Sequence, residues 1–238
     1  KQTIQNNFMN NNLQKDYDNE KFIFLPLHQE PERSLLIAAP YYTNQIETIR
    51  NIAKSIPIDY KLYVKEHPTQ GPARGGRDSS FYKKILSIPN VRLLHPIVTS
   101  EKLIRNCSLV ISIGGTASFE AAFYEKPSII FADLGYGILP SITKINSLDN
   151  LTSIISAVLT KKVEVSDLDK YISLLEDNSF NYDYLEFELA FHKEFYHGGN
   201  LVDVEISEDK MLSFLKKHEE TLEFLAKQYI KKINSYYE

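Results

Sequence analysis

The sequence predicts an α/β fold, in which a doubly wound parallel sheet is followed by a helical C-terminal extension. Short apolar runs, rich in β-branched and aromatic residues, alternate with helix-length segments between residues 21 and 163. The runs are apolar on both sides, as in strands that helices cover on both faces. Each run also ends in polar residues, glycine or proline, which is typical of strand ends.

The elements follow one another in a regular order. Five apolar runs are predicted strands, at residues 21–27, 60–68, 91–96, 108–115 and 127–133. Helices are predicted at residues 44–56, 79–87, 100–106, 116–124 and 151–159. In the first helix, Ile49 and Ile52 share a face, and Asn44 and Glu47 have the spacing of a capping box. This alternation implies a parallel sheet with right-handed crossovers, whose ligand site is expected beyond the carboxyl ends of the strands.

Three regions are expected along the chain. Residues 1–20 are rich in Asn and Gln and predict a linker or peripheral segment. Residues 21–163 form the Rossmann-like domain, with a loop-rich stretch between its last strand and its last helix. Residues 164–238 are mainly helical in pattern, with a break at 197–200 (HGGN) and one or two amphipathic helices at 210–237. We expect this extension to pack on the sheet domain or on a neighbour.

Composition excludes several classes of protein. The 238 residues carry a net charge of −4 without a long basic run, which argues against a nucleic-acid-binding protein. The single cysteine, Cys107, precludes an intramolecular disulfide and a thiolate zinc cluster. The sequence shows no membrane-spanning stretch or signal peptide, so we expect a soluble, cytoplasmic protein. Because the chain begins at Lys1 rather than methionine, we also expect a longer polypeptide upstream.

The strongest chemical signal is the strand-to-helix turn SIGGTASFEAA at 112–122. Gly114 and Gly115 permit a tight turn and a close backbone approach, and amides at a helix start attract phosphate oxygens. Thr116 and Ser118 add hydroxyl donors, and Glu120 is placed to accept hydrogen bonds from a ribose. The alternative is a turn that needs its glycines for packing alone.

Cationic residues follow the second strand. Lys65 and His67 in KEHP (65–68) are expected at the ligand-facing rim, where His67 would stabilise a departing nucleoside phosphate. Arg74 and Arg77, in the glycine-rich stretch 71–78, would neutralise a diphosphate or an acidic sugar from a lid. The alternatives are a strand-end histidine bonded to local backbone, and a surface loop without a ligand.

Two further residues are candidates on weaker grounds. Glu30 lies with Glu32 in a rim loop after the first strand, and we predict a catalytic role facing the acceptor for Glu30 and a solvated position for Glu32. His95 repeats the strand-then-His-Pro pattern, and the peptide groups around it could flank a nucleobase, although the His95 side chain itself favours a structural role. No metal is expected, because amides and cationic side chains can hold the phosphates.

Together, these motifs resemble the C-terminal half of GT-B glycosyltransferases, especially the bacterial capsule and surface-polysaccharide family that includes Kdo transferases. The resemblance covers about residues 21–160 and rests on His67-Pro68 and on residues 112–122. It implies a nucleotide-sugar donor, CMP- or UDP-linked, as substrate without a further cofactor, and transfer of its sugar to a glycan acceptor. Similar elements in bacterial sialyltransferases and teichoic-acid glycerophosphotransferases favour a cytidine nucleotide.

One departure from the family leaves other functions open. A GT-B enzyme has two such domains and only one is visible here, so an N-terminal GT-B domain or partner subunit is expected to supply the general base. One alternative is an isomerase similar to UDP-GlcNAc 2-epimerase. The sequence argues against it, because Thr116-Ala117-Ser118 stands where an acidic pair is expected directly after the glycines. Another is a non-catalytic nucleotide-binding or assembly module that docks through residues 167–238 onto a transferase or the membrane face.

Overall fold

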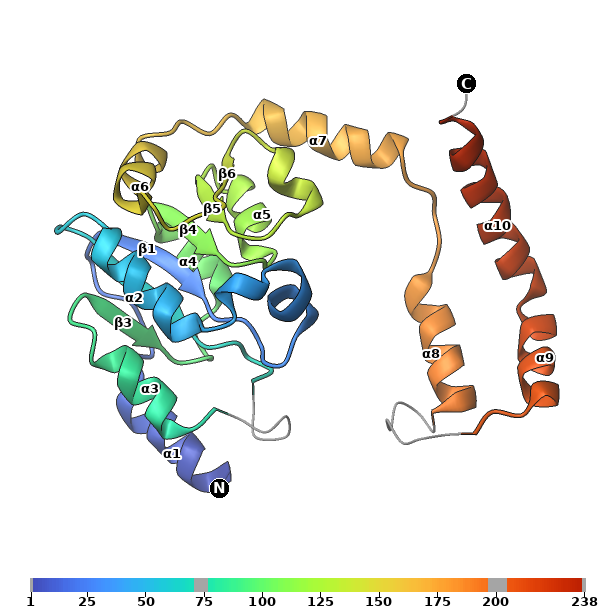
Figure 1. Ribbon diagram of the computed structural model, residues 1–238, viewed down its shortest axis with the longest axis horizontal. Helices are drawn as coiled ribbons and strands as arrows, with labels where there is room; N and C mark the ends of the chain where they lie inside the picture. Colours follow the sequence, from blue (N-terminus) through green and yellow to red (C-terminus); the bar gives the residue numbers. More distant parts are fainter. Residues whose placement is uncertain (1, 71–76, 197–204, 237–238) are drawn as a thin grey trace. The chain divides into compact units, whose positions relative to one another are not determined.

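The computed structural model describes residues 2–70, 77–196 and 205–236. The chain divides into two compact units, residues 1–173 and 174–238. The first unit is the α/β domain, and the second is helical (Figure 1). The predicted α/β fold class is therefore confirmed.

A parallel sheet forms the centre of the first unit. Its six strands in the described chain are β1 (Phe22–Pro26), β2 (Lys61–Lys65), β3 (Val91–Leu94), β4 (Leu109–Ser112), β5 (Ser128–Ile130) and β6 (Ile142–Lys144). They lie in the order β3-β2-β1-β4-β5-β6, and every neighbouring pair is parallel. The order reverses between β1 and β4, which makes the carboxyl ends of these two strands the switch point of the sheet. The last strand, β6, lies in the stretch that was expected to be loop-rich.

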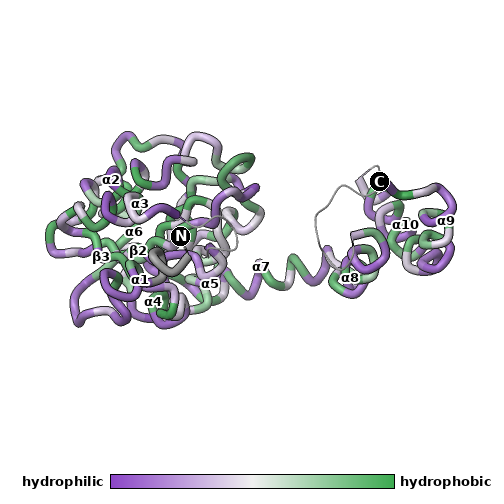
Figure 2. The backbone as a smooth tube through the Cα atoms, turned by 90° about the horizontal axis from the view of Figure 1, so that it is seen from below, coloured by the Kyte–Doolittle hydropathy of each residue, from purple (hydrophilic) through white to green (hydrophobic). Residues whose placement is uncertain are grey.

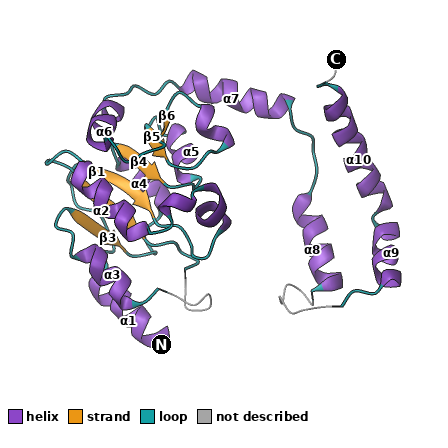
Figure 3. Cartoon of the chain, viewed as in Figure 1, coloured by secondary structure: helices purple, strands orange, loops and turns teal. Residues whose placement is uncertain are grey.

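Alternating side chains of the strands bind helices on both faces of the sheet. Ile23 and Leu25 pack in one cluster with side chains of α2, α3 and α6, whereas Phe22 and Phe24 pack in another with side chains of α4 and α5. Figures 1 and 3 show these helices around the sheet. These helices are α2 (Gln45–Ser55), α3 (Ser79–Leu86), α4 (Ser100–Asn106), α5 (Ala117–Ala122) and α6 (Leu151–Leu159). The two apolar faces explain why the strand sequences are continuous apolar runs.

Side chains cap the helices that lead away from the sheet. Asn44 accepts a hydrogen bond from the amide of Glu47 at 3.3 Å, as the capping-box spacing predicts. Asp78 caps α3 and Thr99 caps α4 in the same way. Each cap satisfies an amide that has no partner within its helix.

The N-terminal segment is part of the first unit. Residues Gln2–Asn12 form α1 (Figure 1), and the side chains of Met9 and Leu13 are buried in the core. An isolated parallel bridge joins Gln14 to Leu94 at the end of β3. The Asn/Gln-rich composition indicated a peripheral segment, but these two apolar side chains anchor it.

The C-terminal helices begin on the first unit and end in the second. Helix α7 (Val165–Asp177) contributes Leu168 to a cluster with β5 and β6, and the boundary between the units lies within this helix. The second unit also contains α8 (Tyr184–Phe195), α9 (Glu208–Lys217) and α10 (Glu219–Asn234). Residues 197–200, the predicted break, lie outside the described residues.

Aromatic rings hold the second unit together. The ring of Phe214 contacts those of Phe187, Phe191, Phe195 and His218, with centroids 4.4–5.9 Å apart. Each helix also carries hydrophilic residues along its length (Figure 2). Among the described helices, none combines the length and the apolar character needed to cross a bilayer.

Candidate functional site

A pocket of about 370 Å³ lies at the carboxyl edge of the sheet, around the ends of β1, β2 and β4. It lies at the switch point, where parallel α/β sheets place their ligands. Residues of both predicted motifs line it, among them Lys65, His67, Pro68, Gly114, Gly115, Thr116 and Glu120. Sequence reasoning therefore placed these two motifs, from β2 and from the β4–α5 turn, at one edge of the sheet.

A buried histidine that the sequence reasoning left without a role joins the two strands at the switch point. His28 follows β1, and its Nε2 accepts a hydrogen bond from the amide of Gly114 at 3.1 Å. Because a backbone amide can only donate, Nε2 carries no proton and the neutral ring is protonated on Nδ1. Burial lowers the pKa of His28, which also favours this neutral form.

Protein groups already bind both glycine amides of the turn. The amide of Gly115 donates to Ser112 Oγ at 2.9 Å, beside the bond from Gly114 to His28. A Cβ on Gly115 would lie 3.1 Å from Cε1 of His28, so this glycine is needed for close packing. The two glycines are therefore better explained by close packing of the turn, the alternative given above, than by phosphate binding.

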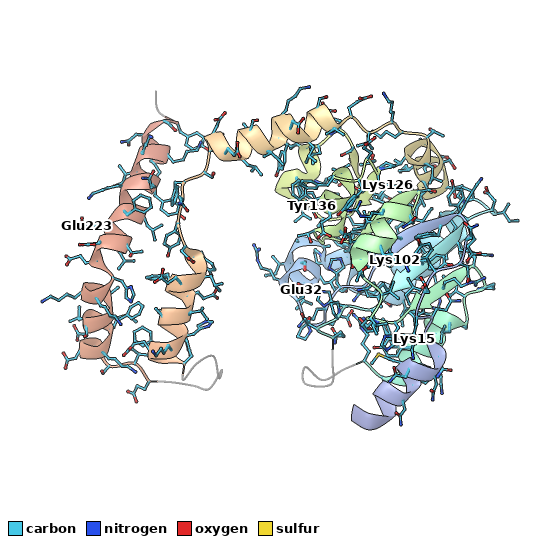
Figure 4. The ribbon with its side chains drawn as sticks, turned by 180° about the vertical axis from the view of Figure 1, so that it is seen from behind. Lys15, Glu32, Lys102, Lys126, Tyr136 and Glu223 are labelled. Carbon is cyan, nitrogen blue, oxygen red and sulfur yellow. The ribbon has the colours of Figure 1, made fainter. Side chains whose placement is uncertain are left out.

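The amides of Thr116 and Ala117 remain at the start of α5. Within the described residues, neither has a hydrogen-bond acceptor in the protein. The Thr116 hydroxyl donates to Glu120 Oε1 at 2.7 Å, which holds this carboxylate at the wall of the pocket. Tyr136, labelled in Figure 4, donates from its hydroxyl to the carbonyl of Gly115 at 2.7 Å and supports the turn from the other side.

His67 presents a donor to the pocket. Its Nδ1 accepts from the amide of Thr69 at 3.2 Å, so the neutral ring is protonated on Nε2. Partial burial lowers the pKa of His67, with the nearby Glu32 and Glu66 opposing the shift. A neutral imidazole with an Nε2 proton can donate one hydrogen bond to an anion.

Lys65 is a buried cation at the pocket wall. The residue is 4% exposed. Within the described residues, its ammonium group makes no hydrogen bond or ion pair, and the residue lines the pocket. Burial lowers the pKa of Lys65, and the charge of Glu66 only partly opposes this. An ammonium group without a partner in a cavity is favourably placed for an anionic ligand.

Arg77 lies away from this pocket. Its guanidinium donates to both carboxylate oxygens of Glu66, at 2.7 and 2.8 Å, and to the carbonyl of His28. Tyr82 donates to the same carboxylate at 2.9 Å. The structure therefore gives Arg77 a buried ion pair rather than a place in a lid: Glu66 lines the pocket, but Arg77 does not. Arg74 lies outside the described residues.

Three other candidates are also occupied within the protein. The Ser118 hydroxyl is fully buried, donates to the carbonyl of Ile129 at 3.4 Å and does not line the pocket. The Nδ1 of His95 accepts from the amide of Ile97 at 3.1 Å, outside the pocket. Glu30 accepts from Gln45 and lies 3.6 Å from Arg77 Nε.

Glu32 is the carboxylate that faces the pocket from the β1 loop. Its Oε2 lies 3.7 Å from Nδ1 of His28, and its side chain is 41% exposed. Figure 4 shows it beside the segment that follows β1. The sequence favoured a solvated position for it, although its spacing of four residues from His28 was a visible signal. Within the described residues, no group of three or more His, Cys, Asp or Glu side chains is arranged to hold a metal ion.

Comparison with known proteins finds no matching family model and no matching curated protein. Solved structures are similar in fold at low identity. UDP-GlcNAc 2-epimerase from Methanocaldococcus jannaschii is 15% identical, with a TM-score of 0.48 over 74% of this chain and 50% of that chain. The β-Kdo 2,7-transferase KpsC from Thermosulfurimonas dismutans is 16% identical, with a TM-score of 0.44 over 68% of this chain and 48% of that chain.

The S. aureus MnaA–UDP co-structure is 14% identical, with a TM-score of 0.43 over 68% of this chain and 42% of that chain. The chain therefore spans about half the length of the structures it resembles. At these identities the likeness concerns the fold alone.

Proposed function

We propose that the first unit binds the phosphate of a nucleotide-sugar and acts as the donor-binding part of a glycosyltransferase. The observation that carries this proposal is the pocket at the switch point, where a buried, unpaired Lys65 and a proton-bearing Nε2 of His67 meet the start of α5. The choice of sugar transfer as the reaction rests on the resemblance of these motifs to those of bacterial surface-polysaccharide transferases.

The groups at the pocket match the oxygens of a phosphate. Lys65 supplies a charge, His67 a directed donor, and the amides of Thr116 and Ala117 two further donors. A phosphate bound here would relieve the desolvation that lowers the pKa of Lys65. The volume of about 370 Å³ also lies within the range of small-molecule sites, roughly 300–1,000 Å³.

These residues would act on the leaving group in sugar transfer. As the bond between the anomeric carbon and the phosphate oxygen breaks, charge develops on the nucleotide phosphate, and Lys65 and His67 would stabilise it. Glu120, held by Thr116, would accept hydrogen bonds from the ribose. We expect the general base to come from an N-terminal domain or partner subunit, and the protein to act in the cytoplasm or at the inner face of the membrane, on a bacterial surface polysaccharide.

Calorimetric titration of the chain with CMP, CDP, UDP and UDP-GlcNAc tests the proposal. We expect binding of at least one nucleotide, with preference for cytidine, and at least about a tenfold loss of affinity in Lys65→Met, because a charged hydrogen bond contributes about 1.5–3 kcal/mol. His67→Ala should also weaken binding. His95→Ala is the matched control, because this ring lies outside the pocket.

Two results would overturn the proposal. One is the absence of binding by all four compounds, and the other is equal affinity in the wild type and Lys65→Met. Turnover of UDP-GlcNAc to its 2-epimer would instead indicate that the same phosphate site belongs to an isomerase rather than to a glycosyltransferase.

A further inference from the structure

A second pocket, of about 580 Å³, lies beside the first in the α/β unit. Its lining, among the described residues, combines the apolar side chains of Pro31, Leu35, Leu36 and Phe81 with three carboxylates and one guanidinium. Glu32 is the one described residue that lines both pockets, so the two cavities adjoin at this residue. No residue in the proposed phosphate site other than Glu32 takes part in this second pocket.

Most charged groups around the second pocket are already bound within the protein. Arg77 is paired with Glu66, and its guanidinium also lies 4.5 Å from the ring centroid of Phe81. Glu30 is held by Gln45 and by the proximity of Arg77. Asp78 caps α3 through the amide of Ser80 at 3.1 Å. The pocket is therefore not an open cluster of acidic groups.

Glu32 differs from these residues. Within the described residues its carboxylate accepts no hydrogen bond and makes one ion-pair contact, with Nδ1 of His28 at 3.7 Å, beyond hydrogen-bond distance. Glu32 lines both the second pocket, with its apolar side chains, and the first pocket, which contains the ammonium group of Lys65, unpaired in the described part of the chain. A ligand that meets Glu32 from the second pocket lies next to a ligand in the first.

The structure assigns the second pocket to a hydroxyl-rich saccharide, bound with its apolar face on Leu36 and Phe81 and with a hydroxyl donating to Glu32. A carboxylate accepts hydrogen bonds from hydroxyls, and the C–H face of a sugar ring packs on apolar and aromatic side chains. A phosphate fits poorly here, because Arg77 is the one cation among the described lining residues and it is already paired. The bridging position of Glu32 makes this saccharide the acceptor, an identification that rests on the proposed function.

Glu32→Gln tests the assignment, because the two pockets predict opposite effects for the loss of one charge. Methyl β-D-glucopyranoside, methyl β-D-galactopyranoside and methyl α-D-mannopyranoside are the saccharide probes, and CMP is the phosphate probe. We expect a saccharide to shift the amide resonances of Leu36, Thr43 and Phe81 in the wild type. In Glu32→Gln its affinity should fall about tenfold, because a hydrogen bond to a charged group is lost.

The same variant should bind CMP as well as the wild type or more tightly, since a carboxylate beside the phosphate repels it. A general loss of structure would weaken the binding of both ligands. Weaker saccharide binding together with unchanged or tighter CMP binding therefore identifies Glu32 as the shared carboxylate. Glu125→Gln, an exposed position in neither pocket, is the control and should change neither affinity.

The outcomes separate this inference from the proposed function. Saccharide shifts at Leu36, Thr43 and Phe81 without binding of CMP, CDP, UDP or UDP-GlcNAc would retain the second site and reject the donor site. The assignment is overturned if no saccharide shifts these resonances, if Glu32→Gln binds the saccharide as well as the wild type, or if only glucosamine, added as an amine-bearing probe, binds.

Discussion

The Nε2 atom of His28 accepts a hydrogen bond from the amide of Gly114 at 3.1 Å, across 86 residues of sequence. The bond joins the end of β1 to the end of β4, where the strand order reverses. In a glycine-rich turn this amide is a natural donor to phosphate, and here an imidazole takes it. In the proposed function, the groups that bind the phosphate are therefore those on the β2 side of the pocket and the next amides of the turn.

Replacing His28 is expected to destabilise the α/β unit. His28→Ala leaves the partly buried amide of Gly114 without its acceptor, which costs about 1 kcal/mol in the free energy of unfolding, in addition to the cost of the cavity left by the buried ring. His28→Gln should recover part of this loss, because the side-chain oxygen can replace Nε2 as acceptor. Denaturant unfolding of the three proteins measures the difference, and equal stability of His28→Ala and the wild type would contradict it.

The stability of the wild type should also depend on pH through His28. Its pKa in the folded protein is lowered from 6.5 by burial. Below pH 6.5 the unfolded chain takes up a proton that the folded protein does not, so the stabilising contribution is present above 6.5 and is lost as the pH falls through the folded pKa. The difference in unfolding free energy between wild type and His28→Gln should therefore shrink on acidification, whereas a constant difference would argue against the assigned tautomer.

Gly115→Ala should destabilise the turn. The new Cβ would lie 3.1 Å from Cε1 of His28 and 3.2 Å from Ser112 Oγ, and hydrogen bonds hold both groups in place. Overpacking costs about 1–3 kcal/mol, more than the roughly 0.4–1 kcal/mol gained from a stiffer unfolded chain. Gly135→Ala is the control, since the nearest atom to its Cβ is 3.9 Å away; its melting temperature should stay the same or rise.

Arg77→Met should be among the most damaging single changes. Arg77 and Glu66 are 4% and 1% exposed, so the change leaves a buried carboxylate that keeps the Tyr82 hydroxyl and the amide of His67 as donors but loses the cation that pairs with it. Removal of one partner from a buried pair costs about 3–5 kcal/mol. Arg105→Met removes an ion pair from the surface, where Arg105 and Glu101 are 56% and 59% exposed, and should cost less than about 1 kcal/mol in urea unfolding.

Lys65→Met should have opposite effects on stability and on binding. Burial lowers the pKa of Lys65 without an ion pair to compensate for it, so methionine of similar length removes a desolvation cost. We expect the melting temperature to stay equal or to rise while nucleotide affinity falls. A variant that loses both would indicate that the ammonium group supports the fold.

The two hydroxyls of the β4–α5 turn should differ in their effect on nucleotide binding. Thr116 lines the pocket and holds Glu120, so Thr116→Ala is expected to weaken binding. Ser118 donates to the carbonyl of Ile129 and lies outside the pocket, so Ser118→Ala should leave affinity unchanged and lower stability by about 1 kcal/mol. Equal losses of affinity in both variants would contradict this distinction.

Most of the sheet could be predicted because its strands are buried on both faces. Such strands are continuous apolar runs, and the five predicted ones match β1 to β5 within a few residues. The capping spacing of Asn44 and Glu47 likewise located the start of α2. Strand β6 was missed because Ile142–Lys144 is short and only Ile142 is buried. Helix α1 was placed at the periphery because most of its residues are polar.

The sequence by itself determined the alternation of strands and helices and the edge of the sheet at which KEHP and SIGG meet, because both follow from local patterns and from the handedness of crossovers. The tertiary structure alone decided the partner of each polar group. His28 binds Gly114, Arg77 binds Glu66, and the side chain of Lys65 is left without a hydrogen bond or ion pair within the described residues. Hydrogen bonds and desolvation depend on groups that lie far apart in the chain, and no local pattern encodes them.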